Sequence, residues 1–85
     1  MHKVKKVKQE KLTLEKAKNL KFGDILNPVG YFNADGTPQR FKVIGKVKTW
    51  KTMPNRVEVP LKRGMYEFLH VTESDLENWR KQKGW

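Results

Sequence analysis

Turn-forming residues recur at short intervals through the middle of this chain, and their spacing constrains the fold more than any other feature. Between positions 23 and 64, glycine, proline and Asn/Asp-Gly clusters leave segments that are too short for long helices. The breaks fall at Gly23, Asn27-Pro28, Gly30, 33–38, Gly45, 53–55, Pro60 and Gly64. Short segments rich in β-branched and aromatic residues, joined by tight turns, are typical of antiparallel sheets. We therefore predict a mainly β chain.

A short helix is expected before the strands. Thr13 can act as its N-cap, and Gly23 ends it. Its apolar face would contain Leu14, Ala17 and Leu20. Residues 24–26 then begin a strand, and residues 33–38 form a hairpin loop.

The run from Arg40 to Lys51 is the clearest predicted strand. One set of alternate positions suits the core, namely Phe41, Val43, Val47 and Thr49. The other set points away from the core and contains Lys42, Ile44, Lys46, Lys48 and Trp50. Gly45 has no side chain to pack, so it marks a point where the strand could bulge or bend, as small barrels require.

Two further strands and a helix complete the predicted order. Residues 56–62 form a strand, and Pro60 places it at a sheet edge or makes it irregular there. Residues 65–71 form the next strand, and Thr72 is the predicted N-cap of a C-terminal helix. The apolar residues of that helix, which would lie on the sheet, are Leu76 and Trp79. We expect an α+β fold built on a small antiparallel barrel of SH3-like or OB-like type.

The chain has 85 residues, which is room for one domain. Residues 1–11 carry five lysines and one acid without clear periodicity, so we predict a flexible basic arm followed by a single β-barrel domain at 12–85. Cysteine is absent, which excludes disulfides and thiolate metal sites and favours a cytoplasmic setting. No apolar stretch is long enough for a membrane span or a signal peptide, so no membrane partner is expected.

Positive charge is concentrated in two parts of the chain. The net charge is +10, from 19 Lys and Arg against 9 Asp and Glu. Beyond the predicted arm, the excess lies in residues 36–66, where eight Lys and Arg are balanced by Glu58 alone. Self-repulsion of this size works against compactness and indicates a polyanionic partner. The alternative is a highly charged surface that serves only solubility.

Residues typical of catalysis or of cofactor binding are few. His2 and His70 are the only histidines, and no spacing of His, Asp and Glu indicates a metal site. The glycines match neither the P-loop nor the dinucleotide fingerprint. We therefore predict no enzymatic activity, no cofactor and no metal. A hydrolytic enzyme would gain support only if Asp24, Asp35 or Glu67 clustered in a concave pocket.

One face of the predicted 40–51 strand has the chemistry of a nucleic-acid site. Lysines at alternate positions, about 6.8 Å apart, can follow a phosphate backbone, and Trp50 offers a stacking surface for a base. The candidate nucleic-acid-binding residues are Arg40, Lys42, Lys46, Lys48, Trp50, Lys51, Arg56, Lys62 and Arg63. Lysine outnumbers arginine, which favours phosphate contact over base recognition.

We expect a non-enzymatic, largely sequence-tolerant nucleic-acid-binding protein, a monomer or weak dimer, with single-stranded DNA or RNA slightly favoured. The alternative is a protein-interaction module that captures an acidic host or phage protein with the same charges. A purely structural explanation is also open, because lysines protect exposed strands from edge-to-edge pairing and Trp50 can belong to the core.

Four segments together resemble a group of small basic proteins of bacteriophages and bacteria that have no assigned activity. These segments are residues 12–26, 33–38, 45–51 and 56–62, and the resemblance covers residues 12 to about 79. It implies a phage or mobile-element origin and assigns no functional residue.

Overall fold

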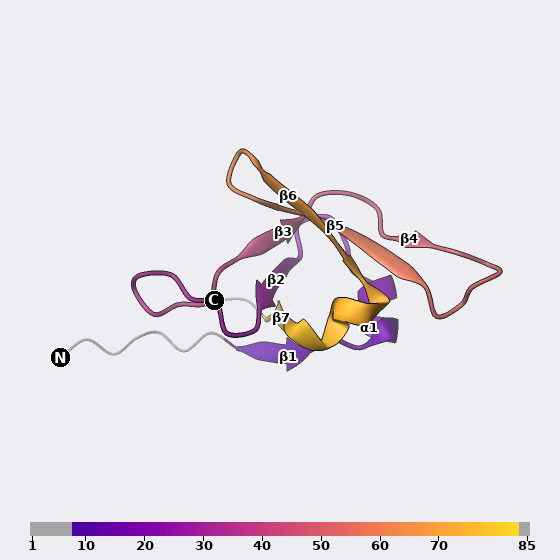
Figure 1. Ribbon diagram of the computed structural model, residues 1–85, viewed down its shortest axis with the longest axis horizontal. Helices are drawn as coiled ribbons and strands as arrows, with labels where there is room; N and C mark the ends of the chain where they lie inside the picture. The colour runs from indigo at the N-terminus through magenta and orange to yellow at the C-terminus, as the bar shows by residue number, and fades with distance from the viewer. Residues whose placement is uncertain (1–7, 84–85) are drawn as a thin grey trace.

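Seven short strands form one antiparallel sheet in residues 8–83, the part of the chain that this computed structural model describes (Figure 1). The strands are β1 (Gln9–Lys11), β2 (Ile25–Pro28), β3 (Phe41–Val43), β4 (Lys48–Thr49), β5 (Val57–Arg63), β6 (Glu67–Thr72) and β7 (Trp79–Gln82). The two short helices are α1 (Leu14–Lys18) and the 3₁₀-helix η1 (Glu73–Asn78). The predicted mainly β, α+β fold is therefore confirmed at the level of its class.

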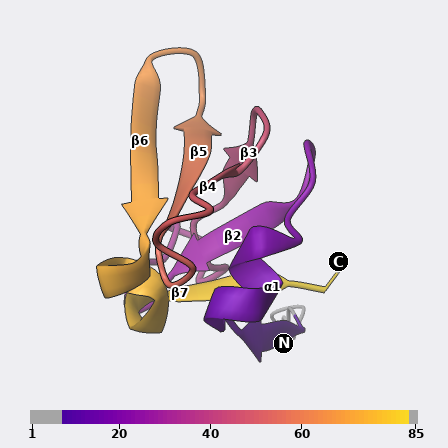
Figure 2. The same ribbon diagram turned by 90° about the vertical axis from the view of Figure 1, so that its right-hand side faces the viewer.

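The sheet curls around its core without closing on itself. Its order is β1-β7-β2-β3-β5, with β6 on one side of β5, and β3 and β4 sharing the other side. Figure 2 shows β6 beside β5 and β5 beside β3, with β2 and β7 crossing below them. The buried apolar side chains form one cluster, drawn from the strands, the two helices and the segments that connect them: Leu12, Ala17, Leu20, Leu26, Phe41, Val43, Val47, Val57, Val59, Leu61, Val71, Leu76 and Trp79.

The predicted N-terminal helix is present. The Thr13 hydroxyl accepts a hydrogen bond from the backbone N–H of Lys16 at 3.2 Å, which is the geometry of an N-cap. Ala17 and Leu20 are buried on the sheet side, as the apolar periodicity predicts. The helix ends at Lys18 with Asn19 as its C-cap, before Gly23, which has a positive φ of 94°.

The single strand predicted from Arg40 to Lys51 is wrong, because the chain bends at its centre and forms β3 and β4 instead. The bend includes Gly45, which faces Pro60 of β5. The Pro60 carbonyl accepts a hydrogen bond from the Ile44 N–H at 3.2 Å. Because the carbonyl and the nitrogen of one strand residue point to the same side, the Pro60 nitrogen faces the gap between the end of β3 and the start of β4. Pro60 therefore lies in a central strand at an interruption of pairing: the predicted irregularity is found, and the predicted edge is not.

The predicted C-terminal helix is also wrong beyond its first turns. Residues 73–78 form a 3₁₀-helix, and Trp79–Gln82 form β7, which pairs with both β1 and β2. The Trp79 ring packs edge-on against Phe41 at 5.2 Å between centroids, and Gln82 accepts a hydrogen bond from Asn27 at 3.0 Å. Pairing on two sides and burial of both side chains outweigh the local helical pattern.

The predicted boundary of the basic arm needs a correction, because residues 9–11 form β1 at the sheet edge. Glu10 holds this strand through ion pairs with Lys16 at 3.3 Å, Lys83 at 3.6 Å and Lys81 at 4.0 Å. The Glu10 carboxylate is thus paired with three lysines from other parts of the chain. Residues 1–7, the rest of the predicted arm, lie outside the described part of the chain.

Candidate nucleic-acid interface

Four side chains from four neighbouring strands form a cross-strand row on the outer face of the sheet. Ile25 of β2 lies opposite Lys42 of β3. Lys62 of β5 lies opposite Lys42 on one side and opposite Phe68 of β6 on the other. Residues directly opposite each other in antiparallel strands project from the same face. At about 4.8 Å per strand, the row spans roughly 14 Å perpendicular to the strands.

The cross-strand row lines an open hollow of about 540 Å³, here called the basic hollow. Its lining residues are Phe22, Ile25, Arg40, Lys42, Ile44, Lys62, Gly64 and Phe68. Phe22 and Phe68 remain 69% and 58% exposed, although both are large apolar side chains. The Lys42 Nζ lies 5.0 Å from the centroid of the Phe22 ring, and the Lys62 Nζ lies 5.6 Å from that of Phe68.

The two lysines of the row face each other without an acid to balance them. Like charges directly opposite in a sheet are destabilising. None of the described residues that line the basic hollow is acidic. Of the two glutamates on β5 and β6, Glu58 lies opposite Lys48, and Glu67 forms an ion pair with Arg63 at 2.7 Å. The free protein therefore holds uncompensated positive charge at this point.

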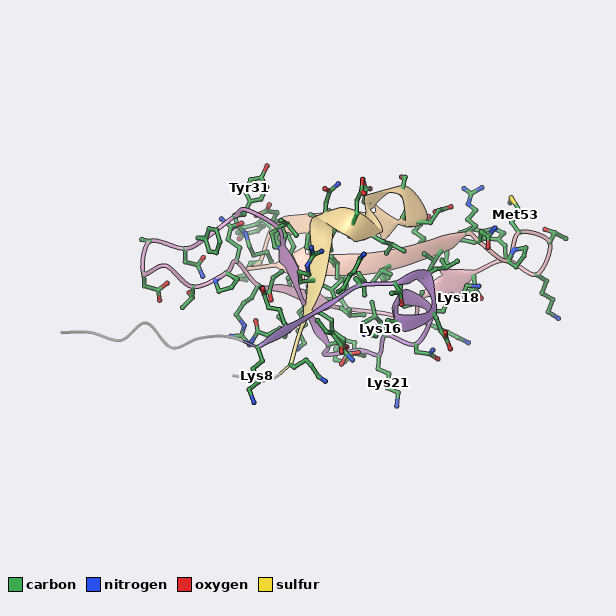
Figure 3. The ribbon with its side chains drawn as sticks, turned by 90° about the horizontal axis from the view of Figure 1, so that it is seen from below. Lys8, Lys16, Lys18, Lys21, Tyr31 and Met53 are labelled. Atoms are coloured by element: carbon green, nitrogen blue, oxygen red, sulfur yellow. The ribbon has the colours of Figure 1, made fainter. Side chains whose placement is uncertain are left out.

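Further lysines continue the same face beyond Phe22. Phe22 also lines a second hollow of about 470 Å³, together with Lys21 and Lys46. Lys46 in turn lines a small third hollow with Lys48, His70 and the acidic Glu58. Lys21 projects from the loop after α1 away from the body of the molecule (Figure 3). The predicted residues Arg40, Lys42, Lys46, Lys48 and Lys62 thus lie along adjoining hollows.

Trp50 lies apart from the basic hollow, in the turn between β4 and β5. The Arg56 guanidinium covers one face of its ring, 4.6 Å from the centroid. Lys51 is exposed in the same turn. Met53, labelled in Figure 3, belongs to the same turn, which lies at one end of the molecule in that view. Trp50 therefore has a cationic neighbour of its own and does not line the hollow that holds the row.

Arg63 does not belong to the predicted basic face. Side chains alternate along β5, and the odd positions point toward the core. The Arg63 guanidinium lies 5.5 Å from the centroid of Phe41, and its Nε donates to the Glu67 carboxylate at 2.8 Å. Strand periodicity therefore places the Arg63 side chain on the opposite face of β5 from Lys62, although the two residues are neighbours in sequence.

Phe22 and Phe68 are the site residues that sequence reasoning missed. Phe68 could have been found, because it alternates with Leu69 and Val71, whose side chains pack in the core. The turn at Gly64 then brings it opposite Lys62. Phe22 carries no comparable signal, because its position depends on how the loop between α1 and β2 hydrogen-bonds to Val43 at the end of β3.

The acidic residues that an enzyme could use do not meet. Asp24 accepts a bond from the backbone N–H of Lys21, and Glu67 pairs with Arg63. Asp35 accepts from the Thr37 hydroxyl and N–H, and these bonds lower its pKa. Within residues 8–83, no group of three or more His, Asp or Glu side chains could hold a metal ion.

No helix in the described part of the chain is long and apolar enough to cross a bilayer. Comparison with protein families, with curated proteins and with solved structures found no match.

Proposed function

We propose that this protein is a non-enzymatic nucleic-acid-binding protein that holds phosphates at the basic hollow with little dependence on sequence. The observation that carries the proposal is the direct opposition of Lys42 and Lys62 without an acidic neighbour in the hollow. This arrangement costs stability in the free protein, and an anion between the two ammonium groups would offset that cost.

Two features favour phosphate over a specific base contact. Lysine ammonium groups act as point charges and lack the planar guanidinium with which arginine makes bidentate hydrogen bonds to guanine. The cations also follow one another along adjoining hollows, from Arg40 and Lys42 past Phe22 to Lys46. A line of separated positive charges suits a polymer of phosphates better than a single small anion.

The curled sheet also bears on the type of fold. Because β3 and β4 share one side of β5 around the bend at Gly45, the sheet turns sharply at this point. We infer that the fold is a partly open small barrel of SH3-like type, with the basic hollow on the outer face of its bent sheet.

The test is a titration of fluorescently labelled oligonucleotides, followed by anisotropy. Lys42→Gln/Lys62→Gln should weaken binding by about two- to thirtyfold, on the basis of 0.2–1 kcal/mol for each exposed charge contact. The control is Lys8→Gln/Lys11→Gln, which removes the same charge from exposed positions at the β1 edge of the sheet. Equal loss in both variants would show that net charge alone is responsible and would contradict the proposed site.

The same titration separates nucleic acid from an acidic protein partner. Polyglutamate of matched charge serves as the competitor. We expect it to displace the oligonucleotide poorly, because it lacks bases and the charge density of phosphates. Preferential binding of polyglutamate would instead support the alternative of an acidic protein partner.

A further inference from the structure

We propose that the ligand at the basic hollow is a single strand of DNA or RNA that crosses the strands of the sheet, with one base stacked on Phe22 and another on Phe68. The inference rests on the proposed function and adds the state of the polymer, its path and the two residues that contact bases.

The exposed rings favour unpaired bases over a duplex. Phe22 and Phe68 are 69% and 58% exposed, and both border the same hollow. Phosphate contact alone does not need them, and leaving them in water forgoes their burial. A base from a single strand can cover such a ring, since base–aromatic stacking is open to every base. The bases of a duplex are already stacked on one another and present only their edges.

The position of each lysine beside each ring supports the same conclusion. Lys42 lies against Phe22 and Lys62 against Phe68, with 5.0 and 5.6 Å between ammonium and ring centroid. Each half of the site therefore offers a stacking surface and a cation within one nucleotide's reach. A base on the ring would bring its own phosphate toward the ammonium group, which then exchanges a cation–π contact for an ion pair.

The row also defines the path of the strand. Phe68 ends the row on β6, and Phe22, which is not part of the row, lies beside Lys42, so the contacts give the order Phe22, Lys42, Lys62, Phe68. Ile25 and Ile44 give the hollow an apolar floor on which a base can lie. Beyond Phe22 the path continues over Lys21 and Lys46. The strand therefore runs perpendicular to β3 and β5.

The test replaces both rings without changing charge. Phe22→Leu/Phe68→Leu is titrated with labelled oligo-dT, oligo-U and a duplex of equal length. Loss of stacking should weaken both single-stranded ligands by about fivefold or more for each ring, with duplex affinity unchanged. Phe22→Tyr/Phe68→Tyr, which keeps the rings, should restore binding. Tyr66→Leu is the matched control, because Tyr66 is 89% exposed in the β5–β6 turn and does not line the hollow.

The outcomes separate this inference from the proposed function. Equal loss for duplex and single strands, or no loss for either, would overturn the stacking inference. If the wild type still bound in a salt-dependent way, the proposed function would stand. No binding of any of the three polymers by the wild type would overturn both. Loss for oligo-U alone, or for oligo-dT alone, would identify the polymer as RNA or DNA.

Discussion

At the scale of single residues, the opposition of Lys42 and Lys62 distinguishes this sheet from an ordinary basic surface. Four residues earlier on β5, Glu58 lies opposite Lys48, where the charges attract. The same strand thus has two favourable cross-strand charge pairs, Glu58 with Lys48 and Arg63 with Glu67, and one unfavourable pair. Comparison of these pairs within one protein allows the free-energy cost of the Lys42–Lys62 pair to be measured.

A double-mutant cycle should show repulsion between the two lysines. We expect Lys42→Gln and Lys62→Gln to reveal an unfavourable coupling of about 0.2–1 kcal/mol in the free energy of unfolding. The coupling should shrink as salt is added, because the two side chains are partly exposed to solvent. Urea unfolding of the four proteins of the cycle, at low and high salt, measures it.

The cycle of Lys48→Gln and Glu58→Gln is the internal control and should give a coupling of opposite sign. Additive effects of the two lysine substitutions, or an attractive coupling between them, would mean that the pair is not strained in the free protein. The main argument for an anionic ligand would then be lost.

At the scale of elements, β1 depends on one carboxylate. Burial of Glu10 works against its charged form, but the hydrogen bond from Lys16 and the charges of Lys16, Lys83 and Lys81 outweigh it and lower the Glu10 pKa below 4.5. A lowered pKa in the folded state means that ionised Glu10 stabilises the fold above pH 4.5. This contribution disappears as the pH falls through the lowered pKa.

Glu10→Gln should therefore be less stable than the wild type at pH 7, with the difference fading as the pH falls below 4.5. Urea unfolding from pH 7 to pH 2.5 measures the difference. Glu77→Gln is the control, since no ion pair of this exposed carboxylate occurs in residues 8–83. A difference between Glu10→Gln and wild type that does not change with pH would contradict the ion-pair account.

The elements that the sequence predicts well are those whose pattern and pairing agree. The alternation of Val57, Val59 and Leu61 predicts the inward face of β5, and all three are buried. Thr13 marks the start of α1 for an equally local reason. Both features depend on neighbours in sequence, so periodicity and capping suffice to find them.

The elements that the sequence does not predict depend on partners far along the chain. Residues 79–82 have a spacing from Leu76 that a helix can use, but they pair with β1 and β2, more than fifty residues earlier. The bend at Gly45 decides which lysines meet, and it brings Lys62 to Lys42 while Trp50 lies elsewhere. The candidate site was thus predicted by face and by charge; strand alternation could also have indicated Phe68, but Phe22 required the tertiary structure.

At the scale of the whole molecule, the net charge of +10 is distributed unevenly over the fold. Acids are used locally: Glu10 holds β1, Glu58 faces Lys48 and Glu67 engages Arg63. On the outer face, none of the described residues that line the basic hollow around the cross-strand row is acidic. A fold that places no acid in this hollow keeps a positive potential there, which attracts a polyanion and speeds its association.

The salt dependence of oligonucleotide binding tests this account most directly. For single strands, the logarithm of the association constant should fall linearly with the logarithm of salt concentration, with a slope near −0.7 for each phosphate neutralised. We predict that Lys42→Gln/Lys62→Gln lowers the magnitude of that slope by about 1.4 relative to the wild type, since two contacts are removed. Lys8→Gln/Lys11→Gln should leave it unchanged. A slope that is identical in the wild type and in Lys42→Gln/Lys62→Gln would show that these lysines bind no phosphate, and would contradict the central claim.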